Sequence, residues 1–161
     1  MTDINMNMQS KTVSLVELLF FAYRDFVADP DHMLEEFGFG RAHHRVVHFV
    51  GRDPGLTVAE LLDILKITKQ SLARVLKELI DKGYIYQKEG ASDRRQRLLY
   101  LTPDGEKLRG RLMGPQIARF ERAFQETGFA PDKFYAMLLH LIDPDNQKMA
   151  EDWAQGLKIG G

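Results

Sequence analysis

Polar residues that can bind nucleic acid recur at helical spacing in the middle of the chain. They are Lys69, Gln70, Ser71, Arg74 and Lys77. The apolar residues of the same stretch fall on the opposite face of the predicted helix: Leu72, Val75, Leu76, Leu79 and Ile80. Arginine can form two hydrogen bonds with a base edge, and lysine can neutralise phosphate charge. The polar face therefore predicts contact with the major groove of double-stranded DNA.

A second basic group follows at the tip of a predicted β-hairpin. Two β-rich runs, 84–88 and 97–101, flank a segment that contains Asp93, Arg94 and Arg95. A hairpin with arginine at its tip can enter the minor groove and sense its width and negative potential. The helix and the hairpin together suit the two grooves of B-DNA.

The distribution of charge agrees with this prediction. Residues 66–97 hold nine Lys or Arg and four Asp or Glu, a net charge of +5, whereas the whole chain carries −1 and the remainder therefore −6. A nearly neutral protein has thus concentrated its positive charge in one window, as attraction to phosphates requires. The alternative is a charged surface that meets only solvent, but here the charge coincides with helix caps and a hairpin.

Capping residues mark the elements that would position these side chains. Thr57 and Glu60 have the spacing of a capping box at the start of a short apolar helix. The turn Lys66-Ile67-Thr68 leads into the helix with the polar face, and Gly83 suits its left-handed end. Thr102-Pro103 then begins another helix. This order predicts a helix–turn–helix followed by a wing.

The segment TVAELLDILKITKQSLARVLKELIDKGYIYQKEGASDRRQRLLYLTPDGEKL resembles the winged helix–turn–helix of MarR-type regulators (multiple antibiotic resistance regulator). It covers about a third of the chain, and the flanking helices agree in length and order. Its most specific part is the wing, Asp93-Arg94-Arg95, followed by residues 99–102 and Gly105. The resemblance implies that Asp93 supports the wing and that Arg95 reaches the minor groove. Leu62 and Lys66 depart from the family pattern, because small residues are common at both positions.

The resemblance also implies a mode of action. Members of this family are regulators of transcription, more often repressors than activators, and a small effector commonly binds between the dimer helices and the DNA-binding lobe. The residues that could line such a pocket here are Phe21, Arg24, Arg41, His44 and Met113. Their cationic groups would favour a small anionic aromatic compound. The chain has no cysteine, so we expect release from DNA to be non-covalent.

Apolar helices flank the predicted DNA-binding lobe, which spans 41–108. The helical patterns over 12–36 and 116–155 carry large apolar residues with no obvious partners in the chain: Phe20, Phe21, Tyr23, Phe134, Met137, Leu141 and Trp153. We predict that these helices form a homodimer interface, with a self-contained helical cap as the alternative. Two recognition helices would then meet successive major grooves of a pseudo-palindromic operator.

Several positions predict interruptions within these helices. Residues 1–11 are polar and predict a frayed N-terminus. Pro30 can interrupt the first helix, and Gly114-Pro115 predicts a kink or a short break, because proline removes a backbone hydrogen bond. Residues 143–145 can separate two terminal helices. The expected fold is mainly α with a small β-hairpin wing, in a single domain over 1–161 that joins the winged helix–turn–helix lobe to N- and C-terminal dimerisation helices.

Histidines offer the main alternative chemistry. His44 and His48 are four residues apart and could share a metal ion, which would make the protein a metal-responsive regulator. No cysteine or clear third ligand adjoins them, and Arg41 and Arg45 oppose a cation. We therefore expect no metal and no cofactor.

Other classes of protein fit the sequence poorly. No serine, histidine and aspartate stand in a recognisable catalytic context, and Gly38-Phe39-Gly40 is too short for a phosphate loop, so we expect no enzymatic activity. The absence of a long apolar run and of a signal peptide predicts a cytoplasmic protein with no membrane partner. A winged-helix module that binds protein and not DNA remains an alternative, although a polar, basic helix face argues against it.

Overall fold

The computed structural model describes residues 8–156. The elements in chain order are α1 (Met8–Glu35), α2 (Arg41–Arg52), β1 (Leu56–Thr57), α3 (Val58–Leu65), α4 (Lys69–Asp81), β2 (Ile85–Glu89), β3 (Arg97–Leu101), α5 (Pro103–Thr127), α6 (Pro131–Leu141) and α7 (Pro144–Gln155). This confirms the predicted fold class, a mainly helical protein with a small β-hairpin wing. The domain range predicted as 1–161 extends beyond the described residues at both ends.

The predicted capping residues begin the helices of the lobe. The Thr57 hydroxyl accepts from the Glu60 amide at 3.2 Å, and the Glu60 carboxylate accepts from the Thr57 amide at 2.8 Å. Thr68 caps α4 and Thr102 caps α5 in the same way, each through its hydroxyl. Lys66, between α3 and α4, adopts a left-handed conformation with φ 52°. Glycine would meet less steric resistance in that conformation than lysine does, because it has no Cβ atom.

The sheet has three antiparallel strands in the order β1-β3-β2. Leu99 at the centre of β3 pairs with Leu56 on one side and Gln87 on the other. Strand β1 was not predicted, because two residues are too few to show an alternating pattern. Strand β2 begins one residue later than the predicted run, and the Tyr84 amide donates to the Leu79 carbonyl at the end of α4.

Glycine at position 105 allows α5 to begin against the hairpin. A Cβ atom at Gly105 would collide with the backbone carbonyl of Tyr84, so only glycine permits this approach. The contact fixes the wing relative to the long helix α5.

The predicted interruption at Pro30 and the predicted break at Pro115 are wrong, because α1 continues through Pro30 and α5 continues through Pro115. The kink that was the other expectation at Pro115 stays a prediction. Proline at position 30 cannot supply the amide that the Phe26 carbonyl needs, but the buried Gln116 side chain of α5 donates to that carbonyl at 3.2 Å. The prediction of a frayed N-terminus is also wrong for residues 8–11, which are helical, and residues 1–7 lie outside the described part.

The hydrophobic core lies in the winged helix–turn–helix lobe. Its fully buried side chains come from α1 to α5 and the three strands, among them Leu34, Val50, Leu61, Leu79 and Leu112. The predicted apolar face of α4 is confirmed, with Ile80 only partly buried. The residues of α6 and α7 are exposed or half-buried.

Two of the residues predicted to lack partners within the chain do have them. Trp153 packs edge-on against Phe49, with ring centroids 5.1 Å apart. The ring centroid of Phe134 lies 5.8 Å from that of Phe120 and 5.9 Å from that of Phe124. The contact of α7 with α2 joins residues about a hundred positions apart, and the contacts of α6 with α5 depend on how the chain turns between these consecutive helices, so local patterns could not indicate either.

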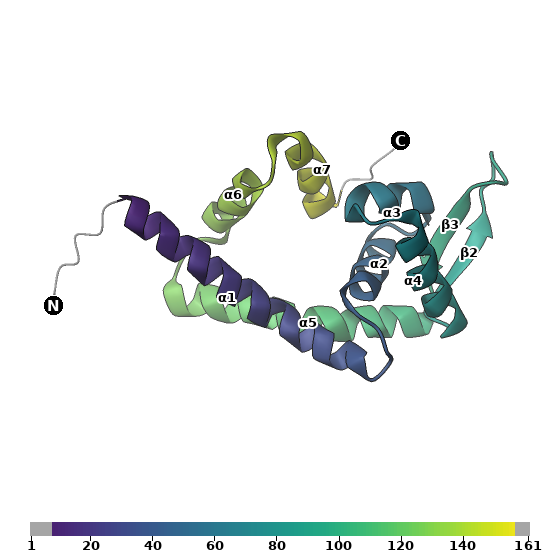
Figure 1. Ribbon diagram of the computed structural model, residues 1–161, viewed down its shortest axis with the longest axis horizontal. Helices are drawn as coiled ribbons and strands as arrows, with labels where there is room; N and C mark the ends of the chain where they lie inside the picture. Colours follow the sequence, from purple (N-terminus) through teal and green to yellow (C-terminus); the bar gives the residue numbers. More distant parts are fainter. Residues whose placement is uncertain (1–7, 157–161) are drawn as a thin grey trace.

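Helices α1 and α5 lie side by side and form a long arm, with the lobe at one end (Figure 1). Helices α6 and α7 turn back from the end of α5, so that α7 reaches α2 (Figure 1). None of the described helices is long and apolar enough to cross a membrane.

Candidate nucleic-acid interface

Helix α4 presents the polar side chains that were predicted to contact the major groove. Lys69, Gln70, Arg74 and Lys77 are exposed. Ser71 is half-buried, and its hydroxyl oxygen accepts from the Thr68 hydroxyl at 2.9 Å. The burial of the opposite face of α4 fixes the rotation of the helix and keeps the polar face outward.

Carboxylates of the same helix pair with two of these cations. Arg74 Nη1 lies 3.0 Å from Glu78 Oε1, and Lys77 Nζ lies 2.6 Å from Asp81 Oδ2. Both pairs have the i, i+4 spacing of neighbours on a helix. The hydrogen bond from Lys77 to Asp81 raises the pKa of the Lys77 amine, which therefore stays charged at neutral pH. A phosphate that approaches Lys77 would compete with Asp81, whereas the Arg74 guanidinium keeps further N–H donors beside its bond to Glu78.

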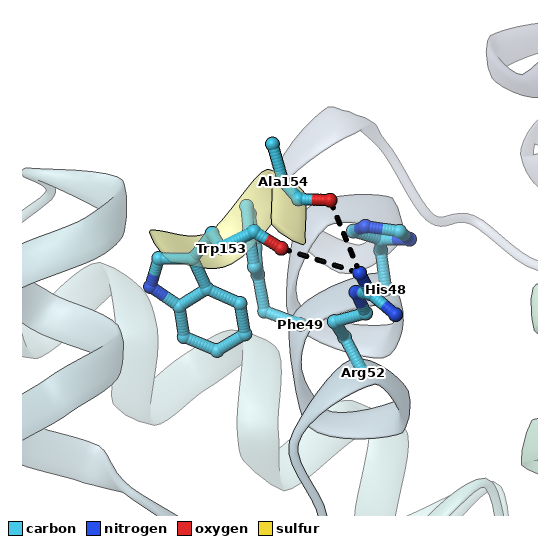
Figure 2. A pocket seen from close by; sticks show the side chains of 5 residues that line it. All are labelled: His48, Phe49, Arg52, Trp153 and Ala154. Carbon is cyan, nitrogen blue, oxygen red and sulfur yellow. Dashed lines mark hydrogen bonds between the residues drawn. The ribbon is translucent and has the colours of Figure 1, made fainter. Parts of the chain in front are cut away.

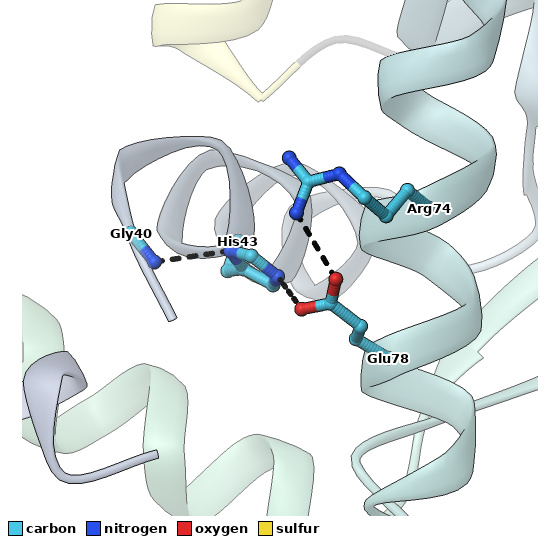
Figure 3. A network of polar contacts seen from close by, with 4 residues as sticks. All are labelled: Gly40, His43, Arg74 and Glu78. Atoms are coloured by element: carbon cyan, nitrogen blue, oxygen red, sulfur yellow. Dashed lines mark hydrogen bonds and ion pairs between the residues drawn. The ribbon is translucent and has the colours of Figure 1, made fainter. Parts of the chain in front are cut away.

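The Arg74–Glu78 pair is connected to a buried histidine through the second oxygen of Glu78, as Figure 3 shows. The other oxygen of Glu78 accepts from Nε2 of His43, a buried residue of α2, at 2.9 Å. This hydrogen bond is the main cause that lowers the pKa of the Glu78 carboxyl, so Glu78 is ionised at neutral pH. Sequence reasoning missed His43 and Glu78. The Arg74–Glu78 spacing was visible in the sequence, but nothing there indicates that His43 lies next to Glu78.

The wing holds its three predicted residues at an exposed tip. The Asp93 carboxylate accepts from the backbone amide of Arg95 at 2.9 Å, and the Asp93 carbonyl accepts from Gln96. Asp93 thus shapes the backbone of the turn, whereas the side chains of Arg94 and Arg95 form no ion pair with the described residues. Those two guanidinium groups are free to meet phosphates or a groove.

Arg97 and Lys88, both on the hairpin, were not among the predicted site residues. Arg97 ends the paired part of the hairpin, where it donates to the Arg94 carbonyl and lies 3.6 Å from Glu89. Lys88 lies over the stacked rings of Tyr86 and Tyr100. Both are exposed and extend the basic surface of the wing.

The five residues predicted to line an effector pocket lie on α1, α2 and α5. Phe21 and Arg24 are exposed, and the Arg24 guanidinium lies over the Phe21 ring and pairs with Asp25. Arg41 pairs with Asp31 at 3.0 Å. His44 and Met113 are half-buried. None of the five lines either of the two cavities described next, and this pocket stays a prediction.

One cavity, of about 320 Å³, lies between α2 and α7 (Figure 2). His48, Phe49 and Arg52 line it from α2, and Trp153 and Ala154 from α7. The Arg52 guanidinium donates to the carbonyls of Trp153 and Ala154, at 3.3 and 3.4 Å, and so caps the end of α7. A second cavity, lined by Asp29, Asp31, His32 and Glu35 among others, lies between α1 and Pro115.

Burial changes the protonation of two histidines of α2. It lowers the pKa of His48 to about 4, with the nearby Arg109, His44 and Arg52 acting in the same direction. Burial also lowers the pKa of His44, although the Asp31 carboxylate opposes this. Both rings are therefore neutral at pH 7. Within residues 8–156, no group of three or more His, Cys, Asp or Glu side chains is placed to hold a metal ion.

These elements define a winged helix–turn–helix protein: α3 and α4 form the helix–turn–helix and β2 and β3 the wing. The sequence matches the MarR family over residues 37–96. The HTH-type transcriptional regulator PetP of Rhodobacter capsulatus is 45% identical over 130 residues, which cover 80% of this chain and 78% of PetP.

Solved structures share the fold. A MarR transcriptional regulator from Methanosarcina mazei superposes with a TM-score of 0.64 at 22% identity, over 84% of this chain and 90% of that one. A mutant of S. aureus MepR bound to an oligodeoxyribonucleotide gives 0.56 at 19% identity, over 86% and 96%. The chain belongs to the MarR family of transcriptional regulators. Its relatives are named as regulators of transcription and not as enzymes, as the sequence predicts.

Proposed function

We propose that this protein is a homodimeric repressor that binds a pseudo-palindromic sequence of double-stranded DNA and is released by a small ligand. The observation that supports DNA binding is the outward polar face of α4 together with the exposed arginines of the wing. Lys69, Arg74 and Lys77 would meet the major groove or its phosphates, and Arg95 the minor groove.

Exposed apolar side chains support the dimer. On α1, Leu15, Leu18 and Phe20 are 62%, 62% and 69% exposed, and on α6, Met137 and Leu141 are 57% and 64% exposed. Apolar faces of this extent are unusual on a monomer. A second copy of the chain, with the same faces, is the partner that could cover them symmetrically.

Ligand release is the part of the proposal that rests most on the family. A ligand can change DNA affinity only if it binds one arrangement of the two lobes better than the other. The cations of the predicted pocket, Arg24 and Arg41, are paired with Asp25 and Asp31. An anionic ligand would therefore have to displace carboxylates there.

Selection from a randomised duplex library by the purified full chain tests the proposal. We expect an enriched inverted repeat with half-sites about one helical turn apart. Arg74→Ala should lower the preference at one base pair, whereas Lys77→Ala should weaken all duplexes alike and reduce the salt dependence by about one charge. Failure to enrich any sequence would favour the alternative, a winged-helix module that binds protein.

Displacement of the protein from the selected duplex tests the ligand. A panel of aromatic carboxylates is compared with zinc ions, and thermal shift reports binding without DNA. Release by carboxylates supports the proposal, whereas release by zinc alone, lost in His44→Ala and His48→Ala, would favour a metal-responsive regulator.

A further inference from the structure

We propose that Glu78 is a positioning residue for Arg74, and that His43 fixes Glu78 so that the recognition helix presents the Arg74 guanidinium in one orientation to a base edge. This inference rests on the proposed function, since it assigns Arg74 to reading a base. Glu78 and His43 need not touch DNA: both act through Arg74.

The two hydrogen bonds of His43 define its tautomer. The Gly40 backbone amide donates to Nδ1 at 3.0 Å, so Nδ1 carries a lone pair and no proton. The ring proton is therefore on Nε2, which donates to Glu78 Oε2. The ring also stacks on Phe39, with centroids 4.4 Å apart. His43 is thus held on both nitrogens and on one face, and Figure 3 shows its ring between Gly40 and Glu78.

Because His43 is fixed in position, its hydrogen bond also restrains the Glu78 carboxylate. One Glu78 oxygen accepts from buried His43, and the other accepts from Arg74. An exposed i, i+4 ion pair by itself does not fix its side chains, because both ends remain free to rotate. In this network the carboxylate cannot rotate without losing the hydrogen bond to His43. The Arg74 guanidinium, which is planar and donates in fixed directions, is consequently restrained as well.

The same helix contains a matched pair that lacks the anchor. Lys77 and Asp81 have the same spacing and the same order of charges as Arg74 and Glu78. They follow that pair within one helical turn of α4. Asp81 is exposed and accepts no hydrogen bond from any other described side chain. The comparison separates two effects of a carboxylate on this helix. One is its negative charge, which Glu78 and Asp81 share; the other is the fixed position, which only Glu78 has.

Restraint of Arg74 matters for specificity because a bidentate contact requires correct orientation. A good pair of hydrogen bonds to a base discriminates against the wrong base by roughly 1–3 kcal/mol. If the arginine becomes ordered only on binding, the loss of side-chain entropy offsets part of this discrimination energy. An arginine that is ordered before binding avoids that cost. Glu78 also repels phosphates, so its removal should strengthen binding to every sequence. The readout must therefore be the ratio of affinities for two sequences.

The experiment measures the affinity of the full chain for two duplexes. The first is the duplex that the wild type selects. The second differs from it only at the base pair where Arg74→Ala loses preference. For Glu78→Gln we expect both affinities to rise and their ratio to fall about tenfold, which is 1.4 kcal/mol. Asp81→Asn removes the same charge and should leave the ratio unchanged. A ratio that is equally unchanged in Glu78→Gln would overturn the inference.

The double variant tests whether Glu78 acts through Arg74. In an Arg74→Ala background, Glu78→Gln should change the ratio no further, whereas an additional loss would show a separate role. His43→Gln and His43→Asn extend the test to α2. Glutamine can place an N–H near the position of Nε2, and asparagine can replace only the Nδ1 acceptor. We expect the ratio to be better preserved in His43→Gln, and the reverse order would contradict the role of His43.

Two outcomes distinguish a failure of this inference from a failure of the proposed function. If the wild type enriches no sequence, the proposed function fails. If the wild type and Arg74→Ala behave as expected and Glu78→Gln keeps its preference, only this inference fails. Nitrogen-15 NMR of the protein without DNA should show His43 as the Nε2-protonated tautomer, and a proton on Nδ1 would contradict the network whatever the DNA measurements give.

Discussion

At the scale of single residues, two buried polar side chains of this protein form hydrogen bonds with groups on other helices. His43 accepts a backbone amide and donates to Glu78, while Gln116 replaces the hydrogen bond that Pro30 removes from α1. Leaving such a buried group unpaired costs more than the bond itself contributes, because the group has lost its water. These positions should therefore be sensitive to small substitutions.

The first prediction concerns Gln116 and Pro30. Gln116→Leu should lower the free energy of unfolding by about 1–3 kcal/mol, because the Phe26 carbonyl would then have no donor. Pro30→Ala restores an amide to α1 and should recover part of the loss. Chemical denaturation of the two single variants and the double variant measures this coupling, and additive effects would contradict the assignment.

The second prediction concerns His48 and acid stability. The pKa of His48 is about 4 in the folded protein, against an ordinary value of 6.5. Between these values the unfolded chain binds a proton that the folded chain does not, so stability should fall as pH falls from 6.5 to 4. We expect a loss on the order of 1–2 kcal/mol, less than the full shift implies, since solvent partly screens this half-buried ring.

Denaturation between pH 4 and 7 checks the effect of His48. His48→Gln should flatten the pH dependence in this range, whereas His32→Gln, which replaces a side chain that is 87% exposed, should not. An unchanged profile in His48→Gln would place the acid sensitivity elsewhere.

At the scale of elements, caps and turns determine where each basic side chain stands. Thr57, Thr68 and Thr102 begin α3, α4 and α5, and Asp93 shapes the tip of the wing. The wing tip lacks a hydrophobic core of its own, since residues 91–97 are all exposed. Its conformation therefore depends on hydrogen bonds within the turn.

The third prediction concerns this turn. Asp93→Ala removes the acceptor for the Arg95 amide together with one negative charge, whereas Asp93→Asn removes the charge and keeps an oxygen acceptor. We expect Asp93→Ala to bind the selected duplex about three- to tenfold more weakly than Asp93→Asn, with the greater loss on A/T-rich flanks, where the minor groove is narrow. Titrations of both variants measure this, and equal affinities would show that the turn does not position Arg95.

At the scale of the whole molecule, the lobe holds the core while the arm exposes apolar surface. The buried side chains extend only from Val27 to Gln116, so the first half of α1 and all of α6 and α7 lie outside the core. Arg52 and Trp153 nevertheless fasten α7 to α2. A partner bound to the arm would thus be connected to the lobe that carries α4 through the contacts of α7 with α2.

The fourth prediction concerns assembly. Leu18→Glu places a charge in the exposed apolar face of α1 and should shift the protein from dimer to monomer at micromolar concentration, because burial of an unpaired charge is costly. Gln9→Glu adds the same charge near the start of the helix and should leave the dimer intact. Light scattering and sedimentation measure the mass. A wild-type monomer that still binds the selected duplex tightly would contradict the dimer.

Much of this protein could be predicted from the sequence, because the signals are local. Helical periodicity placed the apolar face of α4, capping residues placed three helix starts, and the residues of the wing indicated the hairpin. Each of these depends on side chains within about one turn of the backbone that they stabilise. The same local signals carried the resemblance to the MarR family.

Only the tertiary structure decided the features that join distant segments. Pro30 was expected to interrupt α1, yet Gln116 supplies the missing donor from 86 positions further along the chain. Trp153 was expected to lack partners within the chain and to belong to the dimer interface, yet it packs on Phe49. The sequence led to no prediction for His43, yet its side chain bonds to Glu78 of α4. A local pattern specifies which face of a helix is buried, but the packing of the whole chain determines which residue meets it there.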